Sequence, residues 1–334
     1  MYGAHRRRAL LGTVAALLLA YAALTGVGSL PNDNGRALNA QSRAHQTPIG
    51  WPQRGQAAFV LGDGRPAASP HEQPVPIASL AKVMTAYLTL ERYPLSGEQP
   101  GFTIVVTAEQ AQAEAEDAAR EQSVVAVRAG EQLTERQLLE ALLIRSGNNI
   151  APLLASQVAG GETLFLAEMN AEAKVLGMDH TIYTDPSGFD PSTISTAADQ
   201  LRVLRQAMRF AVFRQIVSMA GVTLPVAGRV TNFNPLIAAG YSGKTGSDSA
   251  AGGCLAFFTH VTIGTRRLTA AGVVMGQGAG SDTSMILGAA GEAAEQLVDS
   301  ADHAATIRTV SVGRDVAEPA MSVNQGRTRL ESPR

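Results

Sequence analysis

The order of strand and helix patterns along the chain is the feature that most limits its fold. A short strand pattern at 57–61, followed by a Gly-Asp-Gly turn at 62–64, stands near the start of the patterned sequence. The next long strand patterns come near the end, at 255–262 and 268–275. Between them the apolar residues recur mostly at helical spacing. The pattern predicts an α+β fold in which both chain ends build one sheet, with a mainly helical subdomain inserted between them.

Periodic apolar residues divide the middle of the chain into helices. A helix is predicted from 78 to about 90, and Thr134 with Gln137 has the spacing of a capping box that starts another. Further helices are predicted at 150–158, 164–176, 197–209 and 284–300. The remaining expected elements are a strand at 103–107, an exposed helix or loop at 108–122, and a short strand at 306–312 within a polar tail, 306–334.

The first 40 residues predict export from the cytoplasm. Residues 9–30 carry no charged side chain and follow the basic cluster Arg6-Arg7-Arg8. About 20 apolar residues suffice to span a bilayer as a helix, and the same pattern is typical of a secretory signal. We therefore expect 1–40 to be a signal peptide or N-terminal membrane anchor and 41–56 to be a linker. The remainder is then extracytoplasmic, either secreted or anchored to the cell membrane.

Charge and cysteine content exclude several classes of protein. The 334 residues include 27 basic and 29 acidic side chains, so a net charge of -2 gives no general electrostatic case for nucleic-acid binding. Cys254 is the single cysteine and can form no internal disulfide, and no Cys/His group has the spacing of zinc ligands. The acidic side chains in 108–122 are expected to form a solvated face. We expect no nucleic-acid partner and no metal.

Lysine is rare in this chain. Only Lys82, Lys174 and Lys244 occur, against 24 arginines. An arginine stays protonated at any ordinary pH, whereas the surroundings of a lysine can neutralise its amine and let it accept a proton. The three lysines are therefore the first candidates for proton transfer.

Ser79 and Lys82 lie three residues apart at the start of a predicted helix. Side chains at this spacing share a helix face and can meet. A partly buried lysine amine can take the proton of a serine hydroxyl and make it a nucleophile. Backbone N–H groups of a first helical turn are free to hold an oxyanion. A Ser-x-x-Lys pair alone occurs by chance in many chains of this size.

Two further motifs carry groups that suit the same chemistry. Ser146-Gly147-Asn148 follows a predicted helix, and it is either a plain helix C-cap or a second hydroxyl and an amide presented on a loop. Lys244-Thr245-Gly246 precedes the late strands. A cation and a hydroxyl on an edge strand would suit a terminal carboxylate, and glycine would leave room for a substrate along the strand.

The three motifs together are far more specific than each alone. Their order, Ser-x-x-Lys, Ser-x-Asn, Lys-Thr-Gly, at intervals of 67 and 98 residues, is the signature of penicillin-binding proteins and class A β-lactamases. From about 57 to 300 the chain resembles the low-molecular-mass penicillin-binding proteins of the D-alanyl-D-alanine carboxypeptidase type. The stretches that carry the resemblance are 77–86, 142–149, 169–170, 176–178, 185–189, 195–199 and 243–246.

The resemblance implies a β-lactamase/DD-peptidase-like fold, with a catalytic domain at 57–305. It implies a serine-type carboxypeptidase that removes the terminal D-Ala from peptidoglycan stem peptides through an acyl-enzyme on Ser79. In such an enzyme Lys82 is the general base and Ser146 relays the proton to the departing D-Ala. β-lactam antibiotics acylate the same serine and inhibit the enzyme. No cofactor is implied, and contact with the membrane would be through residues 9–30.

The substrate-binding groups implied by the resemblance come from two motifs. Asn148 would bind substrate and orient the lysine, and Lys244 with Thr245 would recognise the terminal carboxylate. Gly246 would leave space, and the backbone N–H of Ser247 would complete the oxyanion hole with that of Ser79. Many relatives have a His or Thr pair after Lys-Thr-Gly, where this chain has Ser247-Asp248, and many carry a basic residue past the final strand, which 281–287 lacks.

Three other functions compete with this one. A β-lactamase needs a carboxylate that activates water, and Glu168 is the candidate, although its neighbours predict a helix that points it to solvent. A non-catalytic sensor of muropeptides or β-lactams would trap its ligand without releasing it. A nucleotide-binding enzyme is suggested by the Gly-rich turn in 273–280, but its third glycine is out of register and no parallel βαβ unit follows.

Overall fold

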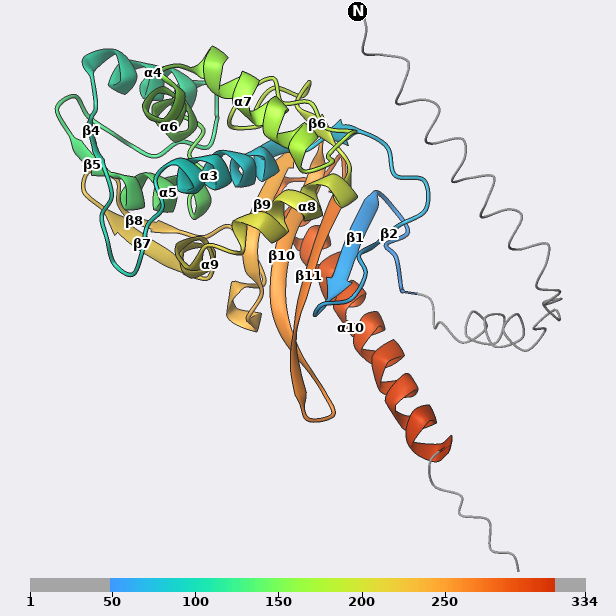
Figure 1. The fold of residues 1–334 in the computed structure, drawn as a ribbon. Coiled ribbons are helices and arrows are strands. Elements are labelled where there is room, and N and C mark those ends of the chain that lie inside the picture. Colours follow the sequence, from blue (N-terminus) through green and yellow to red (C-terminus); the bar gives the residue numbers. More distant parts are fainter. Residues whose placement is uncertain (1–48, 316–334) are drawn as a thin grey trace, which may run out of the picture. The chain divides into compact units, whose positions relative to one another are not determined.

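A computed structural model describes residues 49–315 of the chain (Figure 1). The predicted signal or anchor at 1–40, the first half of the linker at 41–56 and the tail from 316 onward lie outside the described residues. Among the described residues, no single helix is long and apolar enough to cross a membrane, and one bent pair of helices, Ile150–Ala159 with Glu162–Val175, meets the length and composition test only when the two are joined.

The helices and strands follow one another in an order close to the prediction. They are β1 (Gln56–Leu61), β2 (Ala67–Ala68), β3 (Val75–Pro76), η1 (Ala78–Leu80), α3 (Ala81–Arg92), β4 (Thr103–Val105), α4 (Ala108–Ala119), β5 (Gln132–Thr134), α5 (Glu135–Leu143), α6 (Ile150–Ala159), α7 (Glu162–Val175), β6 (Ile194–Ser195), α8 (Ala197–Ala207), α9 (Ala211–Val217), β7 (Gly221–Leu224), β8 (Gly228–Thr231), η2 (Ile237–Ala239), β9 (Ser242–Asp248), β10 (Gly252–Ile263), β11 (Arg266–Gln277) and α10 (Thr283–Asp315).

The main sheet joins the two ends of the described chain. Its five strands lie in the order β2-β1-β11-β10-β9, and every neighbouring pair is antiparallel. Ala58 of β1 and Ala256 of β10 both pair with Val273 of β11, so the early strand and the late hairpin are held in one register. The predicted α+β fold, with an antiparallel sheet built from both chain ends and a helical insertion, is confirmed.

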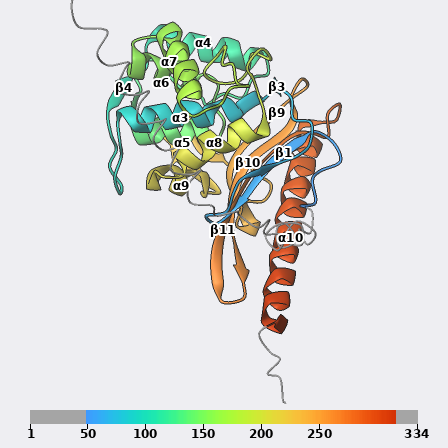
Figure 2. The same cartoon turned by 45° about the vertical axis from the view of Figure 1, so that its right-hand side comes forward.

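Alternating side chains give the sheet two buried faces. Phe59 and Phe257 lie in a cluster with apolar residues of α10, whereas Val60 and Phe258 lie in the larger cluster formed with the other helices. This alternation follows from the strand period of two, because neighbouring side chains point to opposite faces. The sheet is therefore a middle layer, with α10 on one side and α8 with α3 toward the other (Figures 1 and 2).

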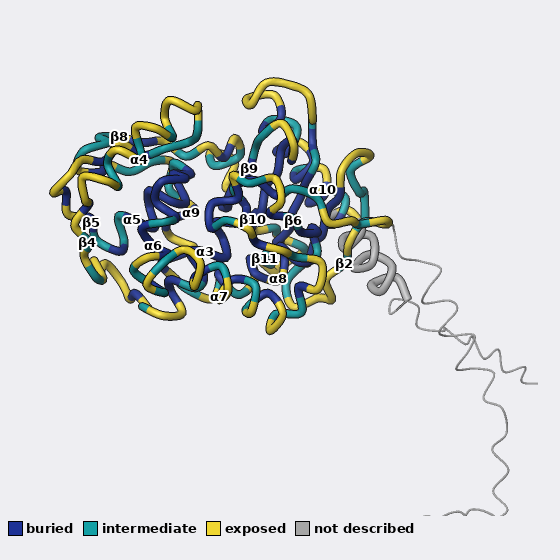
Figure 3. Tube along the Cα trace, turned by 90° about the horizontal axis from the view of Figure 1, so that it is seen from above, coloured by how far each residue is buried: buried dark blue, intermediate teal, exposed yellow. Residues whose placement is uncertain are grey.

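Helix α3 forms the centre of the helical subdomain. Nine of its twelve residues are buried, since it contacts α5, α6, α7 and α8 (Figure 3). Such a helix has no polar face, so a charged side chain on it enters a low-dielectric interior. Lys82 is on this helix.

The strand predicted at 306–312 is wrong, because α10 runs without a break to Asp315. The β-branched residues of that stretch favour a strand only weakly, and tertiary context overrides such preferences. Ala290, Ala294 and Leu297 anchor the helix on the sheet, and from 292 to 312 the sequence has neither glycine nor proline to end it. Once formed, the helix continues.

Candidate active site

Ser79 stands where η1 passes into α3, and Lys82 lies in the first turn of α3. The lysine Nζ and the serine Oγ are 2.7 Å apart. Ala78, the residue before the serine, has φ +45°, a left-handed conformation that is costly for a residue with a Cβ. The turn that aims Ser79 is thus held by its surroundings rather than by its own preference.

The Lys82 amine has three oxygen neighbours. Besides Ser79 Oγ, Nζ donates to Asn148 Oδ1 at 2.7 Å and to the Ser187 carbonyl at 2.8 Å. The amide and carbonyl oxygens can only accept, so they take two N–H groups. A neutral amine has just two, and its lone pair then faces the third neighbour, the serine hydroxyl. This arrangement suits acceptance of the Ser79 proton.

The surroundings of Lys82 favour the neutral amine. The side chain is fully buried, and burial lowers its pKa well below the ordinary value. The positive charge of Lys244 lowers the pKa further, and the carboxylate of Asp185 acts in the opposite direction. Burial is the largest of these effects, so the site favours the neutral amine that a base requires.

A loop that the sequence analysis did not assign to the site supplies one of these contacts. The Asp185 carboxylate accepts hydrogen bonds from the backbone of Ser187, Gly188 and Asp190, which holds the loop in a tight turn. Thr85 of α3 donates to the Pro186 carbonyl at 2.6 Å. Together these bonds direct the Ser187 carbonyl at Lys82. The only signal in the sequence was the stretch 185–189, noted there as a family resemblance.

Ser146 and Lys244 form the second pair of the site. Lys244 Nζ donates to Ser146 Oγ at 2.9 Å and to the Thr245 carbonyl at 2.7 Å. Ser146 follows α5 and has φ +63°, another strained turn at a candidate residue. Burial of Lys244 lowers its pKa to about 7. Its amine therefore changes charge near neutral pH.

Strand β9 lies directly against the turn that carries Ser79. A Cβ added at Gly246 would come within 2.9 Å of the Ile77 carbonyl and 3.2 Å of the Ser79 nitrogen, closer than side chains normally pack. Only glycine fits here without displacing the turn. Thr245 is buried and Ser247 half-buried on the same strand, which is an edge of the sheet. The sequence patterns predicted strands only after this segment, so β9 itself was missed.

Asn148 links this loop to the rest of the helical subdomain. Its Oδ1 accepts from Lys82, while its Nδ2 donates to Gln122 Oε1 at 2.8 Å and its backbone N–H to the Ser123 carbonyl at 2.7 Å. Gln122 could not be predicted as a site residue, since a lone glutamine carries no motif. All eight predicted site residues thus lie on three neighbouring segments: η1 with the start of α3, the loop at 146–148, and β9.

The residues behind the competing functions lie elsewhere. Glu168 is exposed on α7. The Gly-rich stretch 273–280 is the end of β11 and the turn after it. Both neighbours of β11 are antiparallel, so the stretch is not part of a parallel βαβ unit. In the described part of the chain no three His, Cys, Asp or Glu side chains gather as a metal-binding group. Cys254 is buried on β10.

Comparison with known proteins decides the family. The sequence profile of the D-alanyl-D-alanine carboxypeptidase family matches residues 67–279, which is more than half of the chain and includes all three motifs. The chain belongs to this family. The D-alanyl-D-alanine carboxypeptidase DacB2 of Mycobacterium tuberculosis is 37% identical over 45% of the chain and 48% of its own length. A D-alanyl-D-alanine endopeptidase of Pseudomonas aeruginosa is 35% identical over 42% of this chain and 42% of its own length.

The matched region of these curated relatives is less than half of their own length. Solved structures cover more of the chain. An evolved penicillin-binding protein homolog from Mycobacterium tuberculosis is 30% identical with a TM-score of 0.61, over 76% of this chain and 93% of its own. The Streptomyces K15 DD-transpeptidase has a TM-score of 0.63 over 75% of this chain and 98% of its own, at 22% identity, and so shares the fold. This D-alanyl-D-alanine carboxypeptidase family member therefore has the DD-peptidase fold.

Proposed function

We propose that this protein is a serine-type D-Ala-D-Ala carboxypeptidase that removes the terminal D-Ala from peptidoglycan stem peptides. One observation carries the proposal: the buried Lys82 amine contacts Ser79 Oγ while two acceptor-only oxygens, from Asn148 and Ser187, occupy its N–H groups. A lysine held in this way can take the hydroxyl proton as the oxygen attacks a carbonyl. Family membership supports the same reaction.

In the proposed reaction Ser79 attacks the carbonyl between the two D-Ala residues and its proton passes to Lys82. The peptide C–N bond breaks, and Ser146 relays that proton from Lys82 to the leaving D-Ala nitrogen, which departs as an amine. The backbone N–H groups of Ser79 and Ser247 stabilise the oxyanion. Water then hydrolyses the acyl-enzyme and restores Ser79. A β-lactam acylates Ser79 in the same way, but no part of it leaves, so the adduct persists.

Substrate binding is assigned to the loop and strand beside the serine. Lys244, while protonated, pairs with the terminal carboxylate, and Thr245 donates a hydrogen bond to it. The close approach of Gly246 to the serine turn lets an extended peptide lie along β9. Asn148 binds the substrate amide and orients Lys82. No cofactor takes part in this scheme.

We assign the reaction to the outside of the cytoplasmic membrane. Peptidoglycan stem peptides lie there, and the basic cluster followed by the uncharged residues 9–30 is typical of a signal or anchor. The proposed organisation is a signal peptide or anchor at 1–40, a linker at 41–56, a catalytic domain at 57–305 and a tail at 306–334. Any contact with the membrane is assigned to residues 9–30.

Endopeptidase cleavage of cross-links is the second candidate, because relatives from Pseudomonas aeruginosa and Escherichia coli carry the name D-alanyl-D-alanine endopeptidase. A β-lactamase is disfavoured by the exposed position of Glu168. A non-catalytic sensor is disfavoured by the complete set of acylating groups around Ser79.

The test is mass spectrometry of the products. Purified protein is incubated with a pentapeptide that ends in D-Ala-D-Ala and, separately, with a dimer cross-linked through D-Ala. The proposal expects the pentapeptide to lose one D-Ala and the dimer to remain intact. Cleavage of the dimer alone would establish the endopeptidase instead, and a Ser79→Ala variant that still releases D-Ala would overturn the assigned nucleophile.

A further inference from the structure

A pocket of about 460 Å³, separate from the site described above, adjoins the loop that carries Ser146 and Asn148. Its walls come from α4, from the segment 124–126, from the end of α5 and from the β7–β8 hairpin. Two arginines line it, Arg145 and Arg229, together with a single acidic residue, Glu114. None of the eight site residues described above lines this pocket, so the reaction leaves it unexplained.

Arg145 is held in place within this pocket. Its guanidinium carbon lies 4.6 Å from the centre of the Phe233 ring, a stacked cation–π arrangement that fixes the direction of the side chain. Arg145 is half-buried, and among the described residues it forms no salt bridge. A guanidinium presents donors in a planar fork that matches a carboxylate. A preoriented arginine with its charge uncompensated is suited to binding such an anion.

The pocket and the reaction site share one piece of backbone. Arg145 directly precedes Ser146, and Ser123 Oγ donates to the Arg145 carbonyl at 3.0 Å. The Ser123 carbonyl in turn accepts from the backbone of Asn148, and the Asn149 side chain bonds both backbone groups of Val125. Arg145 and Ser146 are consecutive residues, so the pocket borders the loop that carries the proposed proton relay.

We propose that this pocket is a substrate subsite that binds a carboxylate in the acyl-donor part of the peptide, upstream of the two terminal D-Ala residues. The inference rests on the proposed function, since it takes the peptide to be the substrate. Arg145 pairs with the carboxylate, Phe233 keeps the guanidinium oriented, and Arg229 adds a second positive charge from the β7–β8 hairpin.

The charge balance of the pocket agrees with an anionic ligand. Burial raises the pKa of Glu114, a hydrogen bond from the Val127 backbone opposes the shift, and the charge of Asp117 adds to it. The pocket is thus lined by two guanidinium groups and one carboxyl, which leaves an excess of positive groups. The carboxylate recognised here is distinct from the terminal one, which is assigned to Lys244 and Thr245.

The test compares two pentapeptides that end in D-Ala-D-Ala and differ only upstream of that pair, where each free carboxylate of one peptide is a carboxamide in the other. For the unmodified protein, kcat/KM should be about tenfold higher with the carboxylate peptide, as expected when a charge-assisted hydrogen bond replaces a neutral one. In Arg145→Gln the ratio of the two values should fall to about one, and Phe233→Leu should lower it part of the way.

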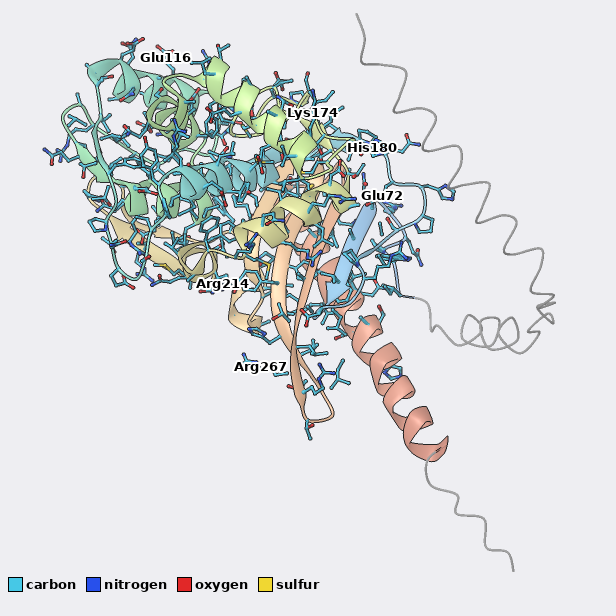
Figure 4. The ribbon with its side chains drawn as sticks, in the orientation of Figure 1. Glu72, Glu116, Lys174, His180, Arg214 and Arg267 are labelled. Carbon is cyan, nitrogen blue, oxygen red and sulfur yellow. The ribbon has the colours of Figure 1, made fainter. Side chains whose placement is uncertain are left out.

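Arg267→Gln is the matched control. Arg267 is an exposed arginine at the end of the β10–β11 hairpin (Figure 4), so its loss should leave the ratio unchanged. A ratio near one in the unmodified protein, with D-Ala released from both peptides, would overturn this inference and leave the proposed function intact. Release from neither peptide would contradict the proposed function itself. Circular dichroism of each variant verifies that it is folded.

Discussion

Lys82 lies between one hydroxyl and two oxygens that can only accept hydrogen bonds. In water a lysine amine is protonated and useless as a base, but a buried amine sheds its charge because desolvation disfavours the ammonium form. Here burial comes from α3, the central helix, and the charge of Lys244 acts in the same direction. The chemistry of the site thus depends on where two of the chain's three lysines lie.

The role of Lys82 predicts the behaviour of a conservative variant. Lys82→Arg should slow acylation by penicillin by about 10³-fold, since a guanidinium stays protonated and cannot accept the serine proton. The rate is measured by the growth of the covalent adduct in intact-protein mass spectra. Lys174→Arg is the control: Lys174 is exposed on α7 (Figure 4), so this variant should acylate at the original rate. A normal rate in Lys82→Arg would exclude Lys82 as the base.

The two lysine pKa values predict opposite limits on the pH profile. Lys82 acts as the neutral amine, so kcat should fall as pH drops through its lowered pKa. Lys244 binds the terminal carboxylate as a cation, and its pKa is about 7, so KM should rise as pH increases above that value. Kinetics of D-Ala release between about pH 5 and pH 9 separate the two effects. A KM that stays constant or falls toward alkaline pH would contradict the assignment of Lys244.

The residue types in the sequence predicted most members of this site, but they predicted only some of the contacts between them. The motifs identified Ser79, Lys82 and Ser146 as candidates because each of these residues has a reactive side chain. The Ser187 carbonyl contributes a backbone atom, which any residue would supply, and Gln122 acts through Asn148. Gln122 left no signal in the sequence, and the stretch around Ser187 was noted only as a family resemblance, so both contacts required the fold.

Helix α5 holds the loop of Ser146 at its C-terminal end and is capped at its N-terminal end. Thr134 and Gln137 form the predicted capping box, in which the threonine hydroxyl accepts from the Gln137 backbone. Helix α4 has the same device in Thr107 and Gln110, but none of its residues is buried. The two helices thus have the same type of N-terminal cap, but α5 is buried and α4 is not.

This contrast predicts different costs for the same change. Thr134→Ala should lower the free energy of unfolding by about 1 kcal/mol, because the cap belongs to a buried helix that melts only with the whole domain. Thr107→Ala should change it less, since an exposed helix can fray locally. Chemical denaturation of both variants gives the two values. Equal losses would show that α4 unfolds only together with the core.

The close contact of β9 with the serine turn makes a second prediction at this scale. Gly246→Ala should slow acylation by about 100-fold or more, because the added methyl group pushes the strand from the Ser79 backbone and a small displacement of reacting groups is costly. Adduct formation is again the readout. Gly264→Ala, in the turn of the β10–β11 hairpin where a Cβ meets no atom within 4 Å, should acylate normally. An unaffected rate in Gly246→Ala would show that the Ser79 turn can accommodate a methyl group at position 246, contrary to this prediction.

The long helices with clear apolar periodicity were predicted correctly from the sequence, whereas short elements and those that depend on tertiary packing were not. Helices α6, α7 and α8 lie within a few residues of the ranges that apolar spacing predicted. The β7–β8 hairpin was missed, because four-residue strands show little alternation. The strand at 306–312 was wrong because a helix anchored on the sheet extended through weak strand formers.

The site belongs to no single segment of the molecule. Ser79 comes from η1 and Lys82 from the central helix α3. Ser146 and Asn148 come from a loop of the helical subdomain, and Lys244 from the edge of the sheet. The sheet is completed by strands from both chain ends, so its edge and the helices take their relative positions only when the domain is folded. Motifs 67 and 98 residues apart meet for this reason.

The position of the covalent adduct tests whether Ser79 is the nucleophile. The protein is incubated with penicillin, and the modified residue is identified by peptide mapping and mass spectrometry, with Ser79→Ala treated in parallel. We expect one penicillin per chain, attached to Ser79 and lost more slowly than it forms, and no adduct in Ser79→Ala. An adduct on another residue, or one that persists in Ser79→Ala, would contradict it.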